Sequence, residues 1–339
     1  MVTIRRLDPQ DDAEFAAFHA AYAAASDFER PHADTWSLAE FVVPFRRTSS
    51  AVEHYGLIAD EAGDVVGVAV IELPLTENLE LGLAAVFVPP EHRRRGIGTA
   101  LARQVATDLR QRGRSSWMSQ IPGRRCDQPD DTVVPGEAFA ARLGMTLRQW
   151  ELQRWLALPA PAERLEALAS QAVDKHRDYR LVRWVNACPD EYVEAYCRLK
   201  SAMVDEMPTG ELELETEVWD EARLRDTEAQ QDAQQRDRYL HVAVAPDGSI
   251  AGHTELVVPK HDPDVVYQWD TLVLPEHRGH RLGLALKVAN LAWVQATHPE
   301  RRSLRTWNAE SNGPMIAVND ALGFEAVEYE GRWQGEVPG

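Results

Sequence analysis

The chain of 339 residues contains only three cysteines, Cys126, Cys188 and Cys197. Their odd number and the lack of a metal-type spacing exclude a disulfide framework and a cysteine-zinc site, so we expect reduced thiols in a cytoplasm. No apolar run approaches the roughly 18 residues that a membrane helix needs. Residues 1–12 also carry charge where a signal peptide would have an apolar core. We therefore expect a cytoplasmic protein with no membrane partner.

Basic residues are scarce relative to acidic ones. The chain has 36 Lys and Arg against 54 Asp and Glu, which gives a net charge of −18. This charge repels the phosphate backbone of a nucleic acid. It keeps a protein soluble and favours cationic small molecules as partners. The composition therefore argues against nucleic acid as a partner.

Two stretches of the chain, residues 90–101 and 275–286, are near copies of one another. Each begins with Pro-Glu-His-Arg, continues as a basic turn with glycines, follows a strand-like apolar run and precedes a helix-like run. A turn of this kind directs backbone N–H groups and the positive end of a helix at one place, which suits phosphate. We therefore expect two related domains, each built around a former or present pyrophosphate site.

The duplication extends over most of the chain. Residues 3–7 match residues 180–184, and Leu143-Gly144 matches Leu322-Gly323. A length of 339 residues suits two domains at about 100–200 residues each. The predicted domains are 1–157 and 179–339, and the proline-containing start of residues 158–178 leads into a linker helix.

The periodicity of apolar residues predicts the same order of elements in both halves. In the first half we predict strands and helices at residues 3–7, 11–25, 55–59, 65–71, 81–88, 101–109, 115–119, 137–143 and 147–155. In the second half we predict a strand at residues 180–184 and then a helix that ends near residue 203. The remaining elements are predicted at residues 241–245, 250–257, 265–274, 284–291, 303–307, 315–322 and 326–329. This order indicates an α/β (α+β) fold.

The order of elements, the Arg-x-x-Gly-x-Gly turn that opens a helix and the later Leu-Gly-Phe (Leu322 to Phe324) resemble the GCN5-related N-acetyltransferase (GNAT) family. Nearly the whole chain is similar to the tandem, two-domain members of actinobacteria such as mycothiol synthase. The resemblance implies two acyl-CoA N-acyltransferase domains, each a mixed, mostly antiparallel sheet flanked by helices. It also implies acetyl-CoA as the acetyl donor and no metal. The loop would hold the pyrophosphate, and pantetheine would lie where the preceding strand splays from its neighbour.

Carried over position by position, the resemblance implies a set of cofactor-binding residues in each half. The first half would use the strand end and the loop: Val86, Phe87, Val88, Arg93, Arg94, Arg95, Gly96, Ile97, Gly98, Thr99 and Ala100. The second half would use Thr271, Leu272, Val273, Arg278, Gly279, His280, Arg281, Leu282, Gly283, Leu284, Ala285, Asn308 and Asn312. Arg281 departs from the motif, because it stands where the family has its first glycine.

Two of these assignments have plainer alternatives. Each loop glycine could be an ordinary turn residue with a positive φ. Asn312 could be a helix cap, because Pro314 follows it in what would be the first turn. A cap and a cofactor contact are compatible, so both interpretations stay open.

Acetyl transfer to a primary amine first requires that the amine lose a proton, since its pKa is about 10.4. A carboxylate on a central strand usually serves as the base. The candidates are Glu255 and Asp270 on the two strands expected to flank the acetyl group, with Glu80 as the first-half counterpart. Each of them could instead be a solvent-facing strand carboxylate.

The leaving thiolate must then gain a proton. In the family this proton commonly comes from a tyrosine four residues before the glycine of Leu-Gly-Phe. Here Asn319 and Ala140 occupy that position, and neither can act as an acid. Another side chain such as Tyr267, a water molecule or direct loss of the thiolate must substitute.

Two further features concern ligands. Eight acidic residues and no basic ones lie between Ser201 and Ala222, and residues 211–215 could present carboxylates to a cationic acceptor or form a solvated loop. His277 and His280 have the spacing of a metal pair, but the neighbouring arginines disfavour a cation. We therefore expect no metal.

The sequence thus predicts an acetyl-CoA-dependent N-acetyltransferase that acts on a small, cationic primary amine. We favour the second half for the chemistry, because it keeps the asparagine segment 308–312, although the first half has the more complete loop. A non-catalytic acyl-CoA-binding module is one alternative. An aminoacyl-tRNA-dependent transferase is another, against which the acidic balance argues. We expect a monomer whose tandem domains replace a dimer, or a homodimer.

Overall fold

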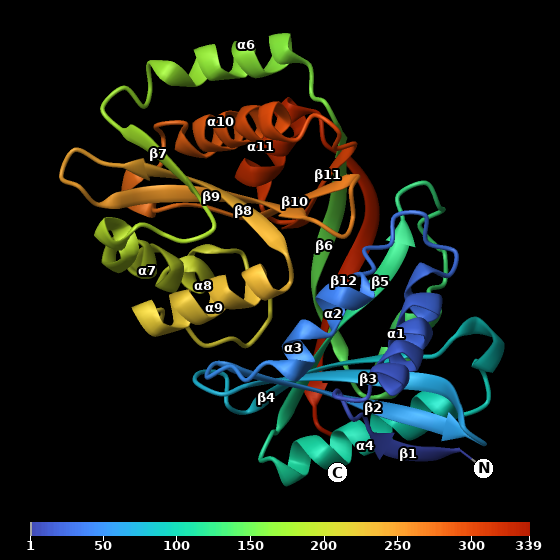
Figure 1. Ribbon diagram of the computed structural model, residues 1–339. Helices are drawn as coiled ribbons and strands as arrows, with labels where there is room; N and C mark the ends of the chain where they lie inside the picture. The colour runs from blue at the N-terminus through green and yellow to red at the C-terminus, as the bar shows by residue number, and fades with distance from the viewer. Residues whose placement is uncertain (1) are drawn as a thin grey trace. The chain divides into compact units, whose positions relative to one another are not determined.

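The computed structural model describes residues 2–339 and divides them into two compact units. The first unit comprises residues 2–124, 128–149 and 330–339, and the second comprises residues 125–127 and 150–329. In Figure 1, each unit is a sheet with helices packed against it. The fold class predicted from the sequence, two tandem domains of mixed sheet flanked by helices, is confirmed.

The first unit orders its strands β1-β2-β3-β4-β5. The strands are β1 (Thr3–Arg6), β2 (Val52–Glu61), β3 (Asp64–Pro74), β4 (Leu81–Phe87) and β5 (Ser116–Arg125). The helices are α1 (Asp12–Asp27), α2 (Leu38–Phe41), α3 (Val43–Arg46), α4 (Ile97–Gln111) and α5 (Pro135–Arg142). Strands β1 to β4 pair antiparallel, whereas β5 runs parallel to β4.

The sequence accounts for the helices on both faces of this sheet. Leu101, Val105 and Leu109 repeat every four residues along α4, and all three are fully buried in the core. Helix α1 begins after Asp11, whose side chain accepts the backbone N–H groups of the next turn. Its buried face carries aromatic rings, including Phe18, which pack with the rings of α2 and α3.

The second unit orders its strands β6-β11-β10-β9-β8-β7. The strands are β6 (Thr146–Ala157), β7 (Arg180–Val185), β8 (Arg236–Val244), β9 (Ile250–Pro259), β10 (Val265–Val273), β11 (Ser303–Ala309) and β12 (Glu325–Glu336). The helices are α6 (Ala162–Val173), α7 (Val193–Ser201), α8 (Met203–Glu206), α9 (Glu221–Ala233), α10 (Leu282–Thr297) and α11 (Gly313–Leu322). Two short 3-10 turns, Pro90–His92 and Pro275–His277, precede α4 and α10.

Two strands pass from one unit into the other. Strand β6 begins in the first unit, and its residues 151–157 pair antiparallel with β11 of the second. Strand β12 begins in the second unit and passes into the first at residue 330; just after the strand, Val337 N donates to Ser115 O at 2.8 Å. The first half of the sequence therefore supplies most of β6 to the second unit, and the second half supplies the last residues of β12 to the first unit. The predicted limits, 1–157 and 179–339, do not include this exchange.

The predicted linker segment, residues 158–178, contains α6, which belongs to the second unit. Leu165, Leu168 and Ala172 on one face of α6 are buried in the same core as Leu291 of α10. Figure 1 shows α6 lying along α10. Helix α6 is therefore a packed part of the second unit.

In each unit, the strand before the basic loop separates from its parallel neighbour. Strand β4 pairs with β5 over Leu81–Leu83 only, and β10 pairs with β11 over Val265–Tyr267 only. Beyond these three residues, both strands keep their antiparallel partners on the other side, β3 and β9. Both units thus contain the splay that the family resemblance implies.

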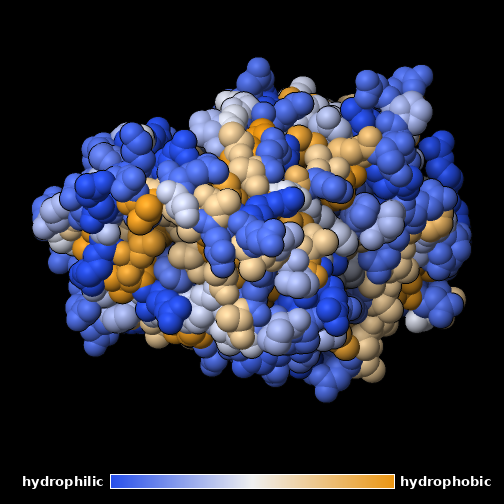
Figure 2. Space-filling view, turned by 90° about the horizontal axis from the view of Figure 1, so that it is seen from above, coloured by the Kyte–Doolittle hydropathy of each residue, from blue (hydrophilic) through white to orange (hydrophobic). Residues whose placement is uncertain are grey.

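The surface is in keeping with the composition. The face in Figure 2 is largely hydrophilic, with smaller hydrophobic areas between the polar side chains. Within residues 2–339, no helix is both long enough and apolar enough to cross a membrane.

Candidate active site

The basic loop of the first unit ends in an open helix N-terminus. Arg94 and Gly96 have positive φ angles of 64° and 85°, which turn the chain into α4. Gly96 precedes the first helical residue, and no side chain caps the helix. A Cβ built on Gly96 would meet nothing within 4 Å, and one on Gly98 would make only ordinary contacts. The unoccupied backbone N–H groups and this open space fit a phosphate group.

The loop of the second unit has positive φ angles at the same two positions as the first, but the glycine and the arginine have exchanged places. Here Gly279 has a φ of 85°, and Arg281, directly before α10, has a φ of 54°. Arg281 thus adopts the left-handed conformation that the motif glycine has in the other loop. No side chain caps α10, and a Cβ on Gly283 would contact only Val273, at 3.8 Å. The departure at Arg281 therefore leaves the anion-binding geometry intact.

The motif arginines brace their own loops. Arg93 Nε donates to Val88 O at 2.9 Å, and Arg278 Nε donates to Val273 O at 3.3 Å, so each side chain holds the end of the preceding strand. Arg278 also pairs with Glu206 at 2.6 Å, and Arg95 pairs with Glu61 at 2.5 Å. The backbone N–H groups are therefore placed for an anion, whereas most arginine side chains would first have to leave a partner.

The histidines of the second loop are engaged within the unit. His277 Nδ1 lies 3.0 Å from the hydroxyl of Tyr179, and His280 Nδ1 lies 3.1 Å from the carbonyl of Lys175. In the part of the chain that the structure describes, no three His, Cys, Asp or Glu side chains are grouped to hold a metal ion.

The strand ends that precede the loops differ between the units. Val86 and Val88 pack against the main core of the first unit, and the Phe87 ring lies edge-on to Tyr22 at 5.0 Å. In the second unit, the hydroxyl of Thr271 is hydrogen bonded to that of Thr254 at 2.8 Å. Leu272 is buried. The first strand end is thus wholly apolar, whereas the second carries hydroxyl groups.

The asparagines after β11 form a connected set. Asn312 caps α11, because its side chain accepts Met315 N at 3.3 Å, which confirms the cap interpretation. Asn308 accepts a hydrogen bond from Asn319 Nδ2 at 2.5 Å. Asn319, at the position where the family has its tyrosine, is fully buried. It therefore fixes Asn308 and supplies no acidic proton.

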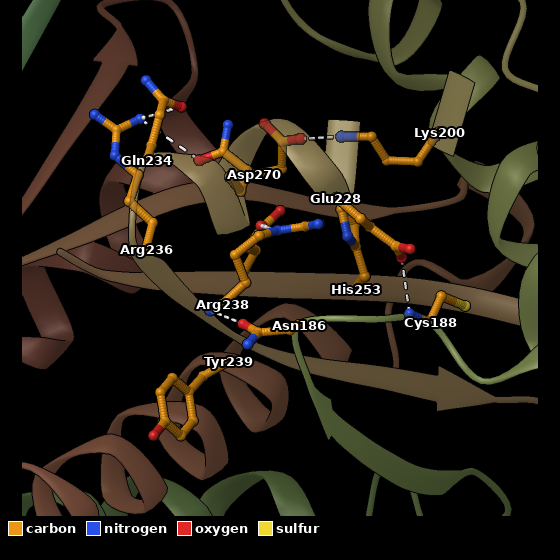
Figure 3. A network of polar contacts seen from close by, with 12 residues as sticks. Asn186, Cys188, Lys200, Glu228, Gln234, Arg236, Arg238, Tyr239, His253 and Asp270 are labelled. Atoms are coloured by element: carbon orange, nitrogen blue, oxygen red, sulfur yellow. Dashed lines mark hydrogen bonds and ion pairs between the residues drawn. The ribbon is translucent and has the colours of Figure 1, made fainter. Parts of the chain in front are cut away.

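Both candidate carboxylates of the second unit are paired with a cation, as Figure 3 shows for Asp270. Lys200 of α7 donates to Asp270 of β10. Arg238 of β8 donates to Glu255 of β9 at 2.5 Å, and both of these side chains are almost completely buried. The sequence analysis identified the two carboxylates but neither cation.

Asp270 is the more accessible carboxylate. About a third of its side-chain surface (34 %) is exposed, against 3 % for Glu255. Burial raises the pKa of Asp270, but Lys200, His253 and Arg238 together lower it by more, so its pKa lies below the ordinary value. Asp270 is therefore an ionised carboxylate at neutral pH with one side open to a ligand.

A buried histidine lies in the same network (Figure 3). His253 Nδ1 is 3.1 Å from the hydroxyl of Tyr196. Burial lowers the pKa of His253 to about 3 and raises the pKa of Tyr196 well above 10, so the imidazole is neutral and the tyrosine keeps its proton.

Tyr267, the candidate proton donor, belongs to a separate apolar cluster. It is buried with Val257 and Val265, and its ring lies 6.4 Å from that of Trp307. Gln268 Nε2 donates to the backbone oxygens of Glu255 at 2.8 Å and of Asp270 at 3.5 Å and so connects the two carboxylate positions, whereas the Tyr267 ring lies in a different cluster.

The first unit has no counterpart of this network. Gly67 and Gly252 occupy equivalent register positions beside matching strand irregularities, and 252 − 67 = 185, the same offset as between the loop arginines, 278 − 93 = 185. The residues equivalent to His253, Glu255 and Asp270 are therefore Val68, Val70 and Ala85.

Glu80 was wrongly predicted to be the first-unit counterpart. It lies just before β4, is exposed, and accepts a hydrogen bond from the Ser115 hydroxyl at 2.9 Å. Its proximity in the sequence to the strand was misleading, because strand register decides which side chains share a face.

The acidic segment between α7 and α9 is partly structural. Glu206 pairs with Arg278, Glu217 pairs with Arg223 at 3.0 Å, and Asp220 caps α9. Residues Glu211, Glu213 and Glu215 are exposed. The segment therefore presents carboxylates on its surface.

Comparison with known proteins gives one consistent result. The model of the acetyltransferase (GNAT) family matches residues 16–122 and 202–324. A tandem GNAT protein from the clavulanic acid biosynthesis pathway, solved without AcCoA, is 29 % identical with a TM-score of 0.81, covering 100 % of this chain and 99 % of that one. A GCN5-related N-acetyltransferase from Sphaerobacter thermophilus is 15 % identical with a TM-score of 0.63, covering 100 % and 96 %. No curated protein matches the chain.

The two matched segments account for most of the chain, and each contains a splayed strand followed by a basic loop at an open helix N-terminus. The chain therefore belongs to the GNAT acetyltransferase family as a tandem pair of domains.

Proposed function

We propose that this protein transfers an acetyl group from acetyl-CoA to the primary amine of a small, cationic acceptor, and that the second unit carries out the chemistry. The observation that supports this proposal is the polar network around Asp270, which the first unit replaces with Val68, Val70 and Ala85. Both units have the loop, but only the second has ionisable groups at these three strand positions.

On the acceptor side, Asp270 is the proposed base. Its ionised, partly exposed carboxylate attracts an ammonium group and takes a proton from it, directly or through water. Glu255 is a positioning residue, because its carboxylate is buried and already bound to Arg238. The exposed Glu211, Glu213 and Glu215 add negative charge that favours a cationic acceptor.

On the donor side, the open N-terminus of α10 would bind the pyrophosphate through backbone N–H groups. Thr271, Leu272 and Val273 would lie along the pantetheine arm, because β10 has left β11 at that point. Bound acetyl-CoA supplies the thioester that reacts with the amine. Asn308, held by Asn319, offers a fixed side chain at the other border of the splay.

Two alternatives make different predictions. A non-catalytic acyl-CoA-binding module would bind acetyl-CoA but turn over no amine. The first unit fits that description, because it has a complete loop and an apolar strand end before it. An aminoacyl-tRNA-dependent transferase would show salt-sensitive tRNA binding, which the net charge of −18 opposes. The neighbour named for the clavulanic acid biosynthesis pathway supports a small acceptor over a macromolecular one.

Calorimetric titration with acetyl-CoA tests the donor site without knowledge of the acceptor. We expect Gly283→Glu to abolish binding in the second unit, because a carboxylate in an anion site opposes the pyrophosphate. Gly283→Gln is the matched control, since it has the same size without the charge, and a Cβ at Gly283 makes only ordinary contacts. The pair Gly98→Glu and Gly98→Gln tests the first unit in the same way.

The pattern of loss is informative. If only Gly98→Glu abolishes binding, the assignment of the donor site to the second unit is wrong. If the wild type binds no acetyl-CoA at all, the acetyltransferase proposal fails. If each of the two glutamate variants loses one of two binding events, both units bind acetyl-CoA. Only the residues on the acceptor side then distinguish the two units.

A further inference from the structure

The second unit contains a buried lysine that the proposed reaction does not use. Lys287 lies in α10, one turn after Gly283, and is 2 % exposed. Its Nζ is 3.9 Å from Met315 Sδ of α11 and 5.7 Å from the centre of the Phe324 ring. Neither neighbour is charged, and within residues 2–339 no carboxylate pairs with this amine. Burial of an amine without a counter-charge strongly disfavours its protonation.

Burial alone lowers the pKa of Lys287 to about 7. Three charged or titratable groups on the elements around α10 have other partners. Arg164 of α6 donates to the Leu322 carbonyl, Asp320 of α11 pairs with Arg154, and His241 of β8 bonds to Asn290. About half of the Lys287 amine is therefore unprotonated near pH 7, which makes it a nucleophile.

Lysine is rare in this chain. Only four of the 36 basic residues are lysines, namely Lys175, Lys200, Lys260 and Lys287. Lys175 and Lys260 are exposed, and Lys200 is bound to Asp270. The position equivalent to Lys287 in the first unit is Ala102, because 287 − 185 = 102.

The placement of Lys287 puts its amine beside the proposed donor site. Helix α10 presents its open N-terminus one turn before Lys287, and the side chain reaches across to the first turn of α11, which Asn312 caps. Helix α10 packs against the strand end, residues 271–273, that would contact pantetheine, since a Cβ on Gly283 would lie 3.8 Å from Val273. An acyl donor bound between the α10 N-terminus and this strand would carry its thioester past the Lys287 amine.

We propose that Lys287 is a self-acetylation site, which accepts the acetyl group of acetyl-CoA bound in the second unit. The amine nitrogen attacks the thioester carbonyl carbon, the C–N bond forms and the C–S bond breaks. The CoA thiolate leaves and takes up the proton that the amine loses. The product is a neutral amide beside α11, which can no longer be protonated and which occupies part of the donor site. The modification thereby limits further donor binding, and the inference rests on the proposed function of this unit.

Incubation of the full chain with isotopically labelled acetyl-CoA, followed by peptide mass spectrometry, tests the proposal. We expect Lys287 to be acetylated at least about tenfold faster than the exposed Lys175 and Lys260, since a lysine on the surface has an ordinary pKa of about 10.4 in general. The rate at Lys287 should rise with pH and level off above about pH 7, as its amine loses its proton. Gly283→Glu should abolish the modification, whereas Gly98→Glu, in the other loop, should not.

Two controls establish the assignment. Unfolding in urea should remove the preference for Lys287, because all four amines then have ordinary pKa values. Lys287→Arg should leave the labelling of Lys175 and Lys260 unchanged. If calorimetry shows acetyl-CoA bound in the second unit but Lys287 reacts no faster than the exposed lysines, self-acetylation is refuted and the proposed function stands. If the second unit binds no acetyl-CoA, both fail.

Discussion

Asp270→Asn is expected to lower the turnover number for acetyl transfer by about 10²–10⁴-fold, the usual contribution of a positioned general base. The amide keeps the shape of the carboxylate but cannot take a proton from the ammonium of the acceptor. Acetyl-CoA binding should not change, because the loop that would hold the pyrophosphate is untouched. Steady-state kinetics with any accepted amine, combined with calorimetric titration of acetyl-CoA, measures both quantities.

Lys200→Met is the companion variant, because it removes the cation that lowers the pKa of Asp270. Without that cation the pKa of Asp270 rises, so the acidic limb of the pH–rate profile should move to higher pH. The turnover number at neutral pH should fall far less than in Asp270→Asn. A turnover number for Asp270→Asn within about tenfold of the wild type would remove Asp270 from the role of base.

Glu255→Ala is expected to lower the free energy of unfolding by about 3–5 kcal/mol, because it leaves the Arg238 guanidinium buried without its partner. The pair lies between adjacent strands at 2.5 Å, and solvent reaches almost none of either side chain. Chemical denaturation followed by circular dichroism measures the loss.

The double variant Arg238→Met/Glu255→Leu is the matched control. Replacing both charges with apolar groups removes the unpaired cation, so the free energy of unfolding should return to near the wild-type value. The double variant should also keep acetyl transfer within about tenfold of the wild type, since Glu255 positions the network and is not the base. A loss below about 1 kcal/mol in Glu255→Ala would show that solvent reaches the pair.

Local patterns in the sequence were sufficient for most of the fold. The four-residue spacing of Leu101, Val105 and Leu109 identified α4, and the apolar runs before the loops identified β4 and β10. Helix α9 was missed because its sequence is almost entirely polar and only Leu224 supplies an apolar buried side chain. No amphipathic pattern can be read from a single such residue.

The exchange of closing strands had no signal in the sequence. Strand β12 continues to Glu336, beyond the predicted end at residue 329, and its added residues belong to the first unit. Which unit a strand joins depends on hydrogen-bonding partners that are far apart in the chain. Apolar alternation shows that a segment is a strand but not which strand it pairs with.

The candidate site shows the same limit. The carboxylates Glu255 and Asp270 could be chosen because they lie on strands next to the motif. Their cations could not, since Lys200 lies 70 residues from Asp270 on a helix, and nothing near Arg238 marks it as a partner. Long-range pairing of this kind depends on the packed fold.

Arg281 illustrates how a motif can differ while its geometry persists. The sequence showed a departure from the motif, because an arginine stands in the place of a glycine. The structure shows the arginine with a φ of 54°, and its side chain donates to the backbone oxygen of Gln171 at 3.4 Å. A non-glycine residue in this conformation costs about 1–2 kcal/mol. Contacts with α6 hold it there.

The most direct test of the central claim is acetyl transfer from labelled acetyl-CoA to a panel of small amines, with the wild type, Gly283→Glu and Gly98→Glu compared side by side. Our account predicts an amine-dependent acetylated product from the wild type and from Gly98→Glu, with cationic amines preferred, and none from Gly283→Glu. Product from Gly283→Glu but not from Gly98→Glu would place the chemistry in the first unit and contradict the account.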